Sequence, residues 1–421
     1  MIDRLDIMPG TEDIPAELTG GGESASASGA RLLLIVTALL VVFGLTMLYS
    51  TSSMLYAPKL PNGVMGMKYF RMQILWLILG LGSAVTVFLA GYRRVAAWWP
   101  FLLGGVFLLL VAALFTKEIN GAHRWLNIRL PGLGTVGIQP SEFAKVALAL
   151  TVSKYCSDHL RTFSELFRKK GGLLELGLYV GPVIAGILAG KDFGTTVLTS
   201  TMVFLVLLAA GLPMRWTLLP VGGLAGAFFV IMNFDPMRRA RVLSFLDPEK
   251  FASTIGYQLW TSFLALGAGG WRGVGFMESR MKAEYLPEAH TDFILAIVGE
   301  ELGLIAMVLV VIAYAVFCWA GLRISLHAST RLGMLLGFGL TMYMTIQAII
   351  NISVISGCLP TKGMPAPFIS YGGSNMLSCM TAVGLLLSIA QETVTPDYNK
   401  RIWAYLRRKR PFGGTAETSG E

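Results

Sequence analysis

Residues 285–303 read Tyr285-Leu-Pro-Glu-Ala-His-Thr-Asp-Phe-Ile-Leu-Ala-Ile-Val-Gly-Glu-Glu-Leu-Gly303, a polar loop that continues as an apolar helix. Pro287 disfavours helical conformation at its own position. Thr291 and Asp292 occupy positions typical of helix N-caps, whose side-chain oxygens accept hydrogen bonds from backbone N–H groups. We therefore expect Asp292 where water meets an apolar layer, either as a helix cap or as part of a functional site.

Ionisable residues crowd the same helix start. Glu288 and His290 precede it, and Glu300 and Glu301 follow about two turns inside the helix. Ionisable groups near a bilayer are costly and usually mark a site or a pathway. Glu300 and Glu301 need partners or a hydrated cavity, and the cluster favours a functional Asp292 over a simple cap.

The composition is that of a membrane protein. Of 421 residues, 54% are hydrophobic and 14% charged, and the mean hydropathy is +0.63. These values predict an all-α polytopic integral membrane protein. Residues 1–30 have acids, Gly and Ser but no apolar run after a basic start, which predicts a disordered cytoplasmic tail and not a signal peptide. The four cysteines lack metal-ligand spacing, so we expect neither a metal site nor a disulfide framework.

Ten apolar runs are long enough to cross about 30 Å of hydrocarbon. They lie at 31–50, 71–91, 97–116, 138–156, 174–190, 195–211, 216–233, 293–320, 332–356 and 373–390. An even number places both termini on one side, and most clusters of Lys and Arg fall on that side, which assigns it to the cytoplasm. We expect a membrane domain over 31–392 and a basic cytoplasmic tail over 393–421.

The largest outer loop, 234–292, lies between spans 7 and 8. Its seven cations are Arg238, Arg239, Arg241, Lys250, Arg272, Arg280 and Lys282. Few cations are expected on that side, so the loop faces either anionic lipid headgroups or an anionic ligand. Ile255–Leu266 predicts an interfacial or re-entrant helix. The glycine-rich run 267–275 predicts a flexible strip able to approach a diphosphate, and it lacks the context of an ATP site.

Further polar residues lie at the ends of other spans. Glu142 and Lys145 are three residues apart at the start of the fourth span and predict an ion pair, because an unpaired charge at mid-bilayer costs on the order of 3 kcal/mol. That pair is either structural or shapes a substrate site. Lys362 precedes the last span, whose start has serines and glycines suited to an anion.

Five motifs, in this order along the chain, are together typical of one family. They are NGAHRW (120–125), QPSEFAK (139–145), GGWRGVG (269–275), YLPEAHTDFILAIVGEELG (285–303) and LPTKGMPAPFISYGGS (359–374). Over about 31–392 the chain resembles the SEDS family (FtsW, RodA, SpoVE) of bacterial cell-wall polymerases. The motif form LPTKG, which contains Lys362, resembles the form in the cell-division members of the family. The departures at Lys191, Phe193 and Asn375 affect only local loop geometry.

The resemblance implies a peptidoglycan glycosyltransferase that polymerises lipid II and releases undecaprenyl diphosphate. Asp292 matches the family's catalytic aspartate, a general base whose charged form a helix start would favour. The substrate-contact candidates are Arg124, Glu142, Lys145, Lys191, Asp192, Arg241, Lys282, His290, Glu300, Lys362, Ser370 and Ser374. No cofactor is required by the pattern, although a divalent cation, Mg²⁺ or Mn²⁺, is able to bridge the diphosphate.

The resemblance also implies partners and a place. We expect a class B penicillin-binding protein as transpeptidase, other membrane proteins of the division complex, membrane lipid, no nucleic acid, and a location in the cytoplasmic membrane at the division septum. Two alternatives stay open. One is a lipid II flippase, in which Glu142, Lys145, Glu300 and Glu301 line a polar path; the other is a non-catalytic division scaffold.

Overall fold

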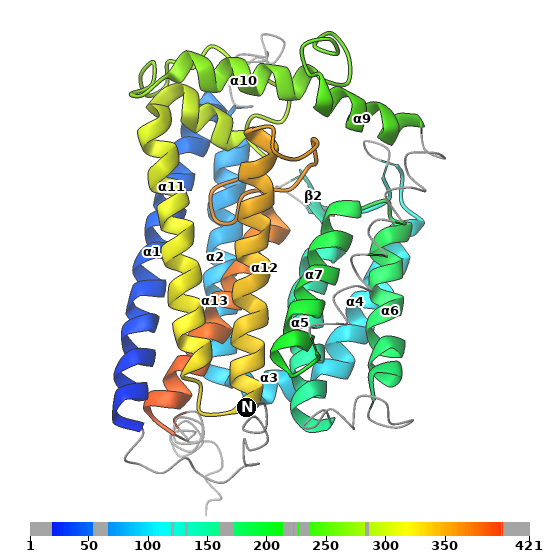
Figure 1. The fold of residues 1–421 in the computed structure, drawn as a ribbon, viewed down its shortest axis with the longest axis vertical. Helices are drawn as coiled ribbons and strands as arrows, with labels where there is room; N and C mark the ends of the chain where they lie inside the picture. Colours follow the sequence, from blue (N-terminus) through cyan, green and yellow to red (C-terminus); the bar gives the residue numbers. More distant parts are fainter. Residues whose placement is uncertain are drawn as a thin grey trace, which may run out of the picture.

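A computed structural model describes residues 19–53, 66–118, 122–130, 134–159, 172–213, 236–282 and 286–396, with the single positions 222, 226 and 398. It is a bundle of long helices crossed at one end by shorter ones (Figure 1). The helices are α1 (Thr19–Ser53), α2 (Gly66–Ala90), α3 (Tyr92–Ala97), α4 (Trp99–Leu114), α5 (Pro140–His159), α6 (Leu173–Ala189), α7 (Phe193–Ala209), α9 (Pro236–Leu246), α10 (Tyr257–Gly269), α11 (Ile294–Leu326), α12 (Arg331–Ile355) and α13 (Gly373–Val394).

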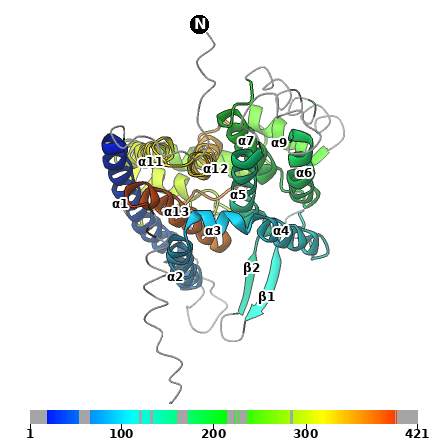
Figure 2. The ribbon, with the colours of Figure 1, turned by 90° about the horizontal axis from the view of Figure 1, so that it is seen from below.

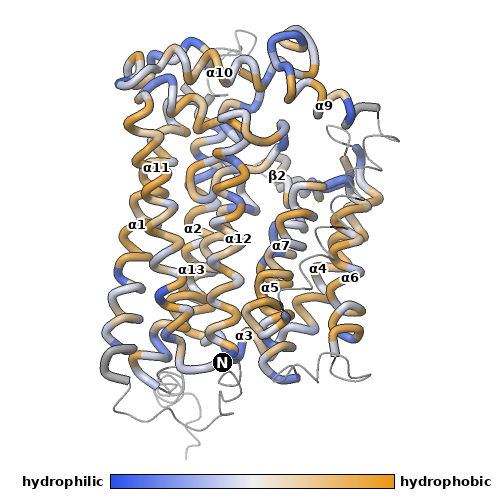
Figure 3. Tube along the Cα trace, in the orientation of Figure 1, coloured by the Kyte–Doolittle hydropathy of each residue, from blue (hydrophilic) through white to orange (hydrophobic). Residues whose placement is uncertain are grey.

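The predicted membrane spans agree with these helices. Within the described residues, five helices are long and apolar enough to cross a membrane, namely α1, α2, α11, α12 and α13. The helices α4, α6 and α7 are shorter and apolar, and α5 carries the charges of the fourth span. The predicted span 216–233 lies outside the described residues, apart from the single positions 222 and 226. Apolar residues fill the middle of the bundle and polar residues gather at its ends (Figure 3).

The helices form two groups, which meet where α12 of one group packs on α5 of the other. One group contains α1, α2, α11, α12 and α13, the other α4 to α7, and α12 packs on both α5 and α7. Most residues of α5 are buried, from Pro140 to Cys156. The start of α1 and the end of α13 lie at the same end of the bundle, opposite α10 (Figure 1).

One local expectation was wrong. The helix α1 begins at Thr19, inside the stretch expected to be disordered, because Ala25 and Ser26 are buried there and Gly29 lets α1 approach the backbone of Ala320 in α11. The structure adds one short β-hairpin to the predicted all-α fold. Strands β1 (Leu126–Leu130) and β2 (Gly134–Ile138) form an antiparallel hairpin, paired from Leu126–Ile138 to Leu130–Gly134, which projects away from the helices (Figure 2).

The helix α11 is broken at Gly303, whose φ of 75° and ψ of −173° interrupt the helical path. The glycine run fills the break. Val274 N donates to Glu300 O at 2.9 Å and Gly275 N to Glu301 O at 3.1 Å, while Leu304 N donates to Gly270 O at 2.9 Å. These bonds satisfy backbone groups that the break would leave unpaired. The run is therefore a fixed structural element, contrary to the expected flexible strip.

Candidate active site

Asp292 lies just before α11, but it does not cap that helix. The N-cap position is Phe293, which makes no side-chain capping bond. The Thr291 hydroxyl instead donates to the Glu288 carboxylate at 2.7 Å. No hydrogen bond reaches the Asp292 carboxylate from the part of the chain that the structure describes. The structure contradicts the helix-cap alternative, and the carboxylate is left available for chemistry.

The surroundings of Asp292 make it a better base than expected. Burial, and next the negative charge of Glu288, raise the pKa of the Asp292 carboxyl from 3.8 to about 7, against the opposing effect of the Arg124 guanidinium. Asp192 adds a smaller upward contribution. The expectation that a helix start would keep this carboxylate charged fails because these effects outweigh it. A pKa near neutrality suits a general base.

The backbone on both sides of Asp292 is tied to the last outer loop. Asn351 Nδ2 of α12 donates to Asp292 O at 2.8 Å and to Met364 O at 2.7 Å. The Asp292 carboxylate lies against Gly363, where a Cβ would come within 2.6 Å of Oδ2. A side chain at position 363 would displace the Asp292 carboxylate, so the outer loop that carries Lys362 and Gly363 packs directly against Asp292.

His290 is held in an aromatic cluster beside Asp292. Its ring lies 4.2 Å from the Tyr69 ring and 6.0 Å from the Tyr371 ring, between ring centroids. Tyr371 N donates to His290 O at 2.9 Å. Burial lowers the pKa of His290, with Glu288 acting in the opposite direction. The imidazole is therefore neutral at neutral pH.

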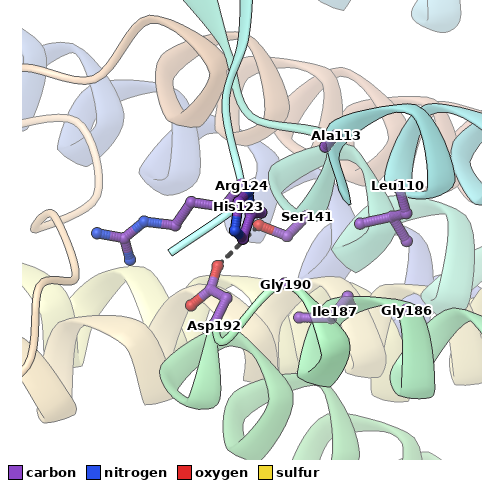
Figure 4. A pocket seen from close by; sticks show the side chains of 9 residues that line it. All are labelled: Leu110, Ala113, His123, Arg124, Ser141, Gly186, Ile187, Gly190 and Asp192. Atoms are coloured by element: carbon purple, nitrogen blue, oxygen red, sulfur yellow. Dashed lines mark hydrogen bonds between the residues drawn. The ribbon is translucent and has the colours of Figure 1, made fainter. Parts of the chain in front are cut away.

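Arg124 and Asp192 lie at a small pocket between the helix ends, shown in Figure 4. It is lined by Leu110, Ala113, His123, Arg124, Ser141, Gly186, Ile187, Gly190 and Asp192. Arg124 Nε is buried and has no hydrogen-bond partner among the described residues. This guanidinium is a cation that remains available to an anionic group.

Asp192 is bound by protein donors on several sides. Its carboxylate accepts from Gln139 Nε2 at 2.9 Å, from Ser141 Oγ at 3.0 Å (Figure 4) and from Thr195 N at 3.3 Å. It caps α7 and ties that helix to the start of α5. Its bonds position these helix ends and leave little of the carboxylate for a substrate.

The predicted ion pair in α5 is present and is buried. Lys145 Nζ lies 2.7 Å from Glu142 Oε2 and also donates to Gln347 Oε1 at 2.7 Å. Gln347 Nε2 in turn donates to Asn375 Oδ1 at 2.9 Å. The Lys145 side chain is only 1% exposed, so this network joins α5, α12 and α13 and does not face open solvent.

The remaining candidates occupy different surroundings. Lys191 is half exposed and pairs with Glu118 at 3.1 Å. Lys282 and Glu300 are buried and bind protein groups. Lys362 Nζ lies 5.7 Å from the centre of the Phe193 ring, close to the start of α7. The Arg241 side chain lies outside the described residues.

The two serine candidates have structural bonds. Ser370 Oγ accepts from Ala366 N at 2.8 Å, which bends the loop onto itself. Ser374 Oγ accepts from Gln139 N at 3.0 Å, which joins α13 to α5. Both serines are buried, so the described site centres on Asp292, Arg124, His290 and Lys362.

Comparison with known proteins identifies the lineage. Residues 30–395 match the model of the family named for FtsW, RodA and SpoVE and described as cell cycle protein. The chain belongs to the FtsW/RodA/SpoVE family. It is a multi-pass membrane protein.

Relatives within this family carry consistent names. A probable peptidoglycan glycosyltransferase FtsW of Geobacter metallireducens is 36% identical over 363 residues, covering 85% of this chain and 94% of the relative. Stage V sporulation protein E of Bacillus subtilis is 32% identical, covering 86% and 96%. These relatives extend over nearly all of the membrane region.

Solved structures share the fold. A chain of a peptidoglycan synthase complex, described as coordinating polymerization and crosslinking, matches with a TM-score of 0.69 and 26% identity, covering 86% of this chain and 98% of that one. The rod shape determining protein RodA of Thermus thermophilus matches with a TM-score of 0.61 and 23% identity, covering 86% and 96%. The latter likeness supports the fold alone.

Several residues around Asp292 were not predicted. Asn351, Tyr69 and Tyr371 come from three separate segments, and only Tyr371 lies within one of the five motifs. A polar Asn within an apolar span was the available hint, since buried amides usually bind backbone groups. Within the described residues, no group of three or more His, Cys, Asp and Glu side chains is placed to hold a metal ion.

Proposed function

We propose that the chain is a peptidoglycan glycosyltransferase that polymerises lipid II at the outer face of the cytoplasmic membrane, with Asp292 as general base. The observation that carries this proposal is the state of the Asp292 carboxyl. Its pKa is about 7, and its oxygens accept no hydrogen bond from the described residues. The names of the relatives support the same activity.

In the proposed reaction, the acceptor sugar's 4-hydroxyl attacks the anomeric carbon of the donor. A bond forms between the 4-oxygen and that carbon, the bond from the carbon to the diphosphate oxygen breaks, and the hydroxyl proton passes to Asp292. At pH 7 about half of the Asp292 carboxyls are ionised, which combines availability with basicity. The leaving group departs as undecaprenyl diphosphate.

The leaving diphosphate needs neutralisation by cations. Arg124 is favoured because its Nε is buried without a partner among the described residues and its charge acts on Asp292. Lys362 is the second candidate, since its neighbour Gly363 touches the Asp292 carboxylate. A divalent cation, Mg²⁺ or Mn²⁺, would be held mainly by the diphosphate, with one or two carboxylates such as Asp292 or Glu288 within its reach.

The partners and location form part of the proposal. A class B penicillin-binding protein would crosslink the glycan, which the likeness to a chain of a synthase complex supports. Both termini would be cytoplasmic, the loop 234–292 would be outside, and the protein would act at the division septum with other division proteins. The flippase alternative is weakened because the four polar residues proposed to line its path are buried and bonded to protein groups.

The test is glycan polymerisation from labelled lipid II in liposomes, with and without a class B penicillin-binding protein. Wild type should form polymer and Asp292→Asn should not, since asparagine accepts no proton at this pH. Asp158→Asn is the matched control, because Asp158 is exposed and pairs only with Lys154 among the described residues. A fully active Asp292→Asn would refute the base assignment, and lipid II movement without polymer would favour a flippase.

A further inference from the structure

The break in α11 leaves two adjacent carboxylates with different partners. Residues next to each other on a helix point about 100° apart, and here Glu300 faces the preceding loop while Glu301 faces α1. Both side chains are almost fully buried, at 2% and 0% exposed. Their backbone carbonyls also accept the hydrogen bonds from Val274 and Gly275. The two residues therefore bind the loop through side chain and main chain together.

Glu301 is the centre of a buried ion pair. Lys282 Nζ lies 2.7 Å from Glu301 Oε1, and both side chains are 0% exposed. The Ser50 hydroxyl at the outer end of α1 donates to the Glu301 carboxylate at 2.8 Å and accepts from Lys282 Nζ at 3.0 Å. The three groups join α1, the large loop and α11 at one point.

Glu300 holds the turn that carries Lys282. Its carboxylate accepts from the Ser279 hydroxyl and from Arg280 N at 2.9 Å. Ser279 Oγ also accepts from Lys282 N at 3.2 Å. The turn is therefore fixed before the lysine side chain reaches Glu301.

Lys282 and Glu301 lie 19 residues apart, on either side of Asp292. The ion pair thus closes a loop that contains the proposed base. We propose that Lys282, Glu301 and Ser50 are positioning residues for glycosyl transfer, whose buried contact holds both ends of the segment that presents Asp292. This inference rests on the proposed function.

The burial of both charges favours a positioning role for this ion pair over a purely stabilising one. Two charges taken out of water lose hydration that their attraction often fails to repay, so a buried ion pair is weak evidence for stability and better evidence for a fixed arrangement. Lys282 was expected to contact substrate. Its ammonium is fully covered and already bonded to two oxygens, so its effect on the reaction passes through Asp292.

The first test is the double variant Lys282→Met/Glu301→Gln, which removes both charges and leaves no unpaired ion. In the lipid II polymerisation assay, we expect kcat per folded molecule to fall about 100-fold, the effect of a misplacement near 1 Å, while KM stays within about twofold. The acid limb of the pH profile should move to lower pH as Asp292 becomes more hydrated. The control is Lys154→Met, which breaks an exposed pair and should change none of these.

A merely structural pair would give a different result. It would reduce the yield of folded protein but leave kcat per folded molecule and the acid limb as in wild type, and that outcome would overturn the proposal. If the double variant does not fold, Ser50→Ala removes only one hydroxyl from the same cluster. It should lower kcat several-fold at constant KM, and an unchanged kcat would equally overturn the proposal.

Hydrogen–deuterium exchange separates this inference from the proposed function. Amides of residues 286–293 should exchange at least about tenfold faster in the double variant, and in Ser50→Ala to a smaller degree, while those of α13 should keep their rates. This readout needs no activity. If wild type forms no polymer, the proposed function fails. Faster exchange at 286–293 in the variants would still show that the buried contact holds this segment. Unchanged exchange there would refute the inference.

Discussion

Replacing Asp292 by asparagine should stabilise the protein while abolishing its proposed activity. The carboxyl has a pKa of about 7 in the folded chain, against an ordinary value of 3.8. A tenfold change in an ionisation constant corresponds to about 1.4 kcal/mol, so ionisation of Asp292 costs the folded state up to roughly 4 kcal/mol. Asparagine is nearly isosteric and carries no charge, so it avoids this cost.

The sign of the effect fixes its pH dependence. Because the folded-state pKa is raised, the folded carboxyl binds its proton more tightly than the unfolded one, and stability falls as pH rises from about 4 to about 7. The gain from Asp292→Asn should be near zero at pH 4 and complete above pH 7. Apparent melting temperatures of the two proteins in detergent, taken across this range, measure it.

The control is Asp158→Asn at the exposed pair with Lys154, for which the difference in melting temperature should stay close to zero at every pH. A constant difference between Asp292→Asn and wild type from pH 4 to pH 8 would refute the raised pKa. It would also remove the main support for a base tuned to neutrality.

Four further variants have expected outcomes. Glu288→Gln removes a negative neighbour of the Asp292 carboxyl and should shift the acid limb of kcat/KM to lower pH. Arg124→Met should shift the acid limb to higher pH and also weaken the reaction. Shifts in the opposite directions would contradict the electrostatic effects assigned to these two residues. Gly273→Ala should lower the yield of folded protein sharply, because φ is +81° and an added methyl group would collide with the backbone of α11. Gly267→Ala, where that methyl meets nothing within 4 Å, should be neutral or slightly stabilising, and equal behaviour of the two glycine variants would contradict the packing described.

Much of the membrane domain follows from local sequence properties. Hydropathy alone predicts the spans that the described residues cover, and the spacing of Glu142 and Lys145 is enough to predict their ion pair, since both lie on one helix face. Asp292 was found because ionisable groups beside an apolar helix are rare. These features depend on residues close together in the chain.

Other features depend on segments that meet only in the folded chain. The hairpin does have a local signal, an alternation of apolar and polar residues over Leu126–Leu130 followed by Pro131-Gly132, but hydropathy over long runs does not register it. The bond between Asn351 and Asp292 spans 59 residues, and nothing local predicts it. The pKa of Asp292 likewise depends on Arg124 and Asp192, which come from distant parts of the sequence.

The glycines of residues 269–275 bear on how such runs are interpreted in sequence searches. Phosphate-binding loops are also rich in glycine, yet the glycines of this run are required for steric reasons, since a Cβ at Gly269 or Gly273 would overlap main-chain atoms of residues 299–302. The partner of this glycine run is another stretch of polypeptide. A glycine-rich pattern in a membrane protein can therefore mark a segment whose backbone packs into the break of a neighbouring helix. Its presence alone does not identify a ligand.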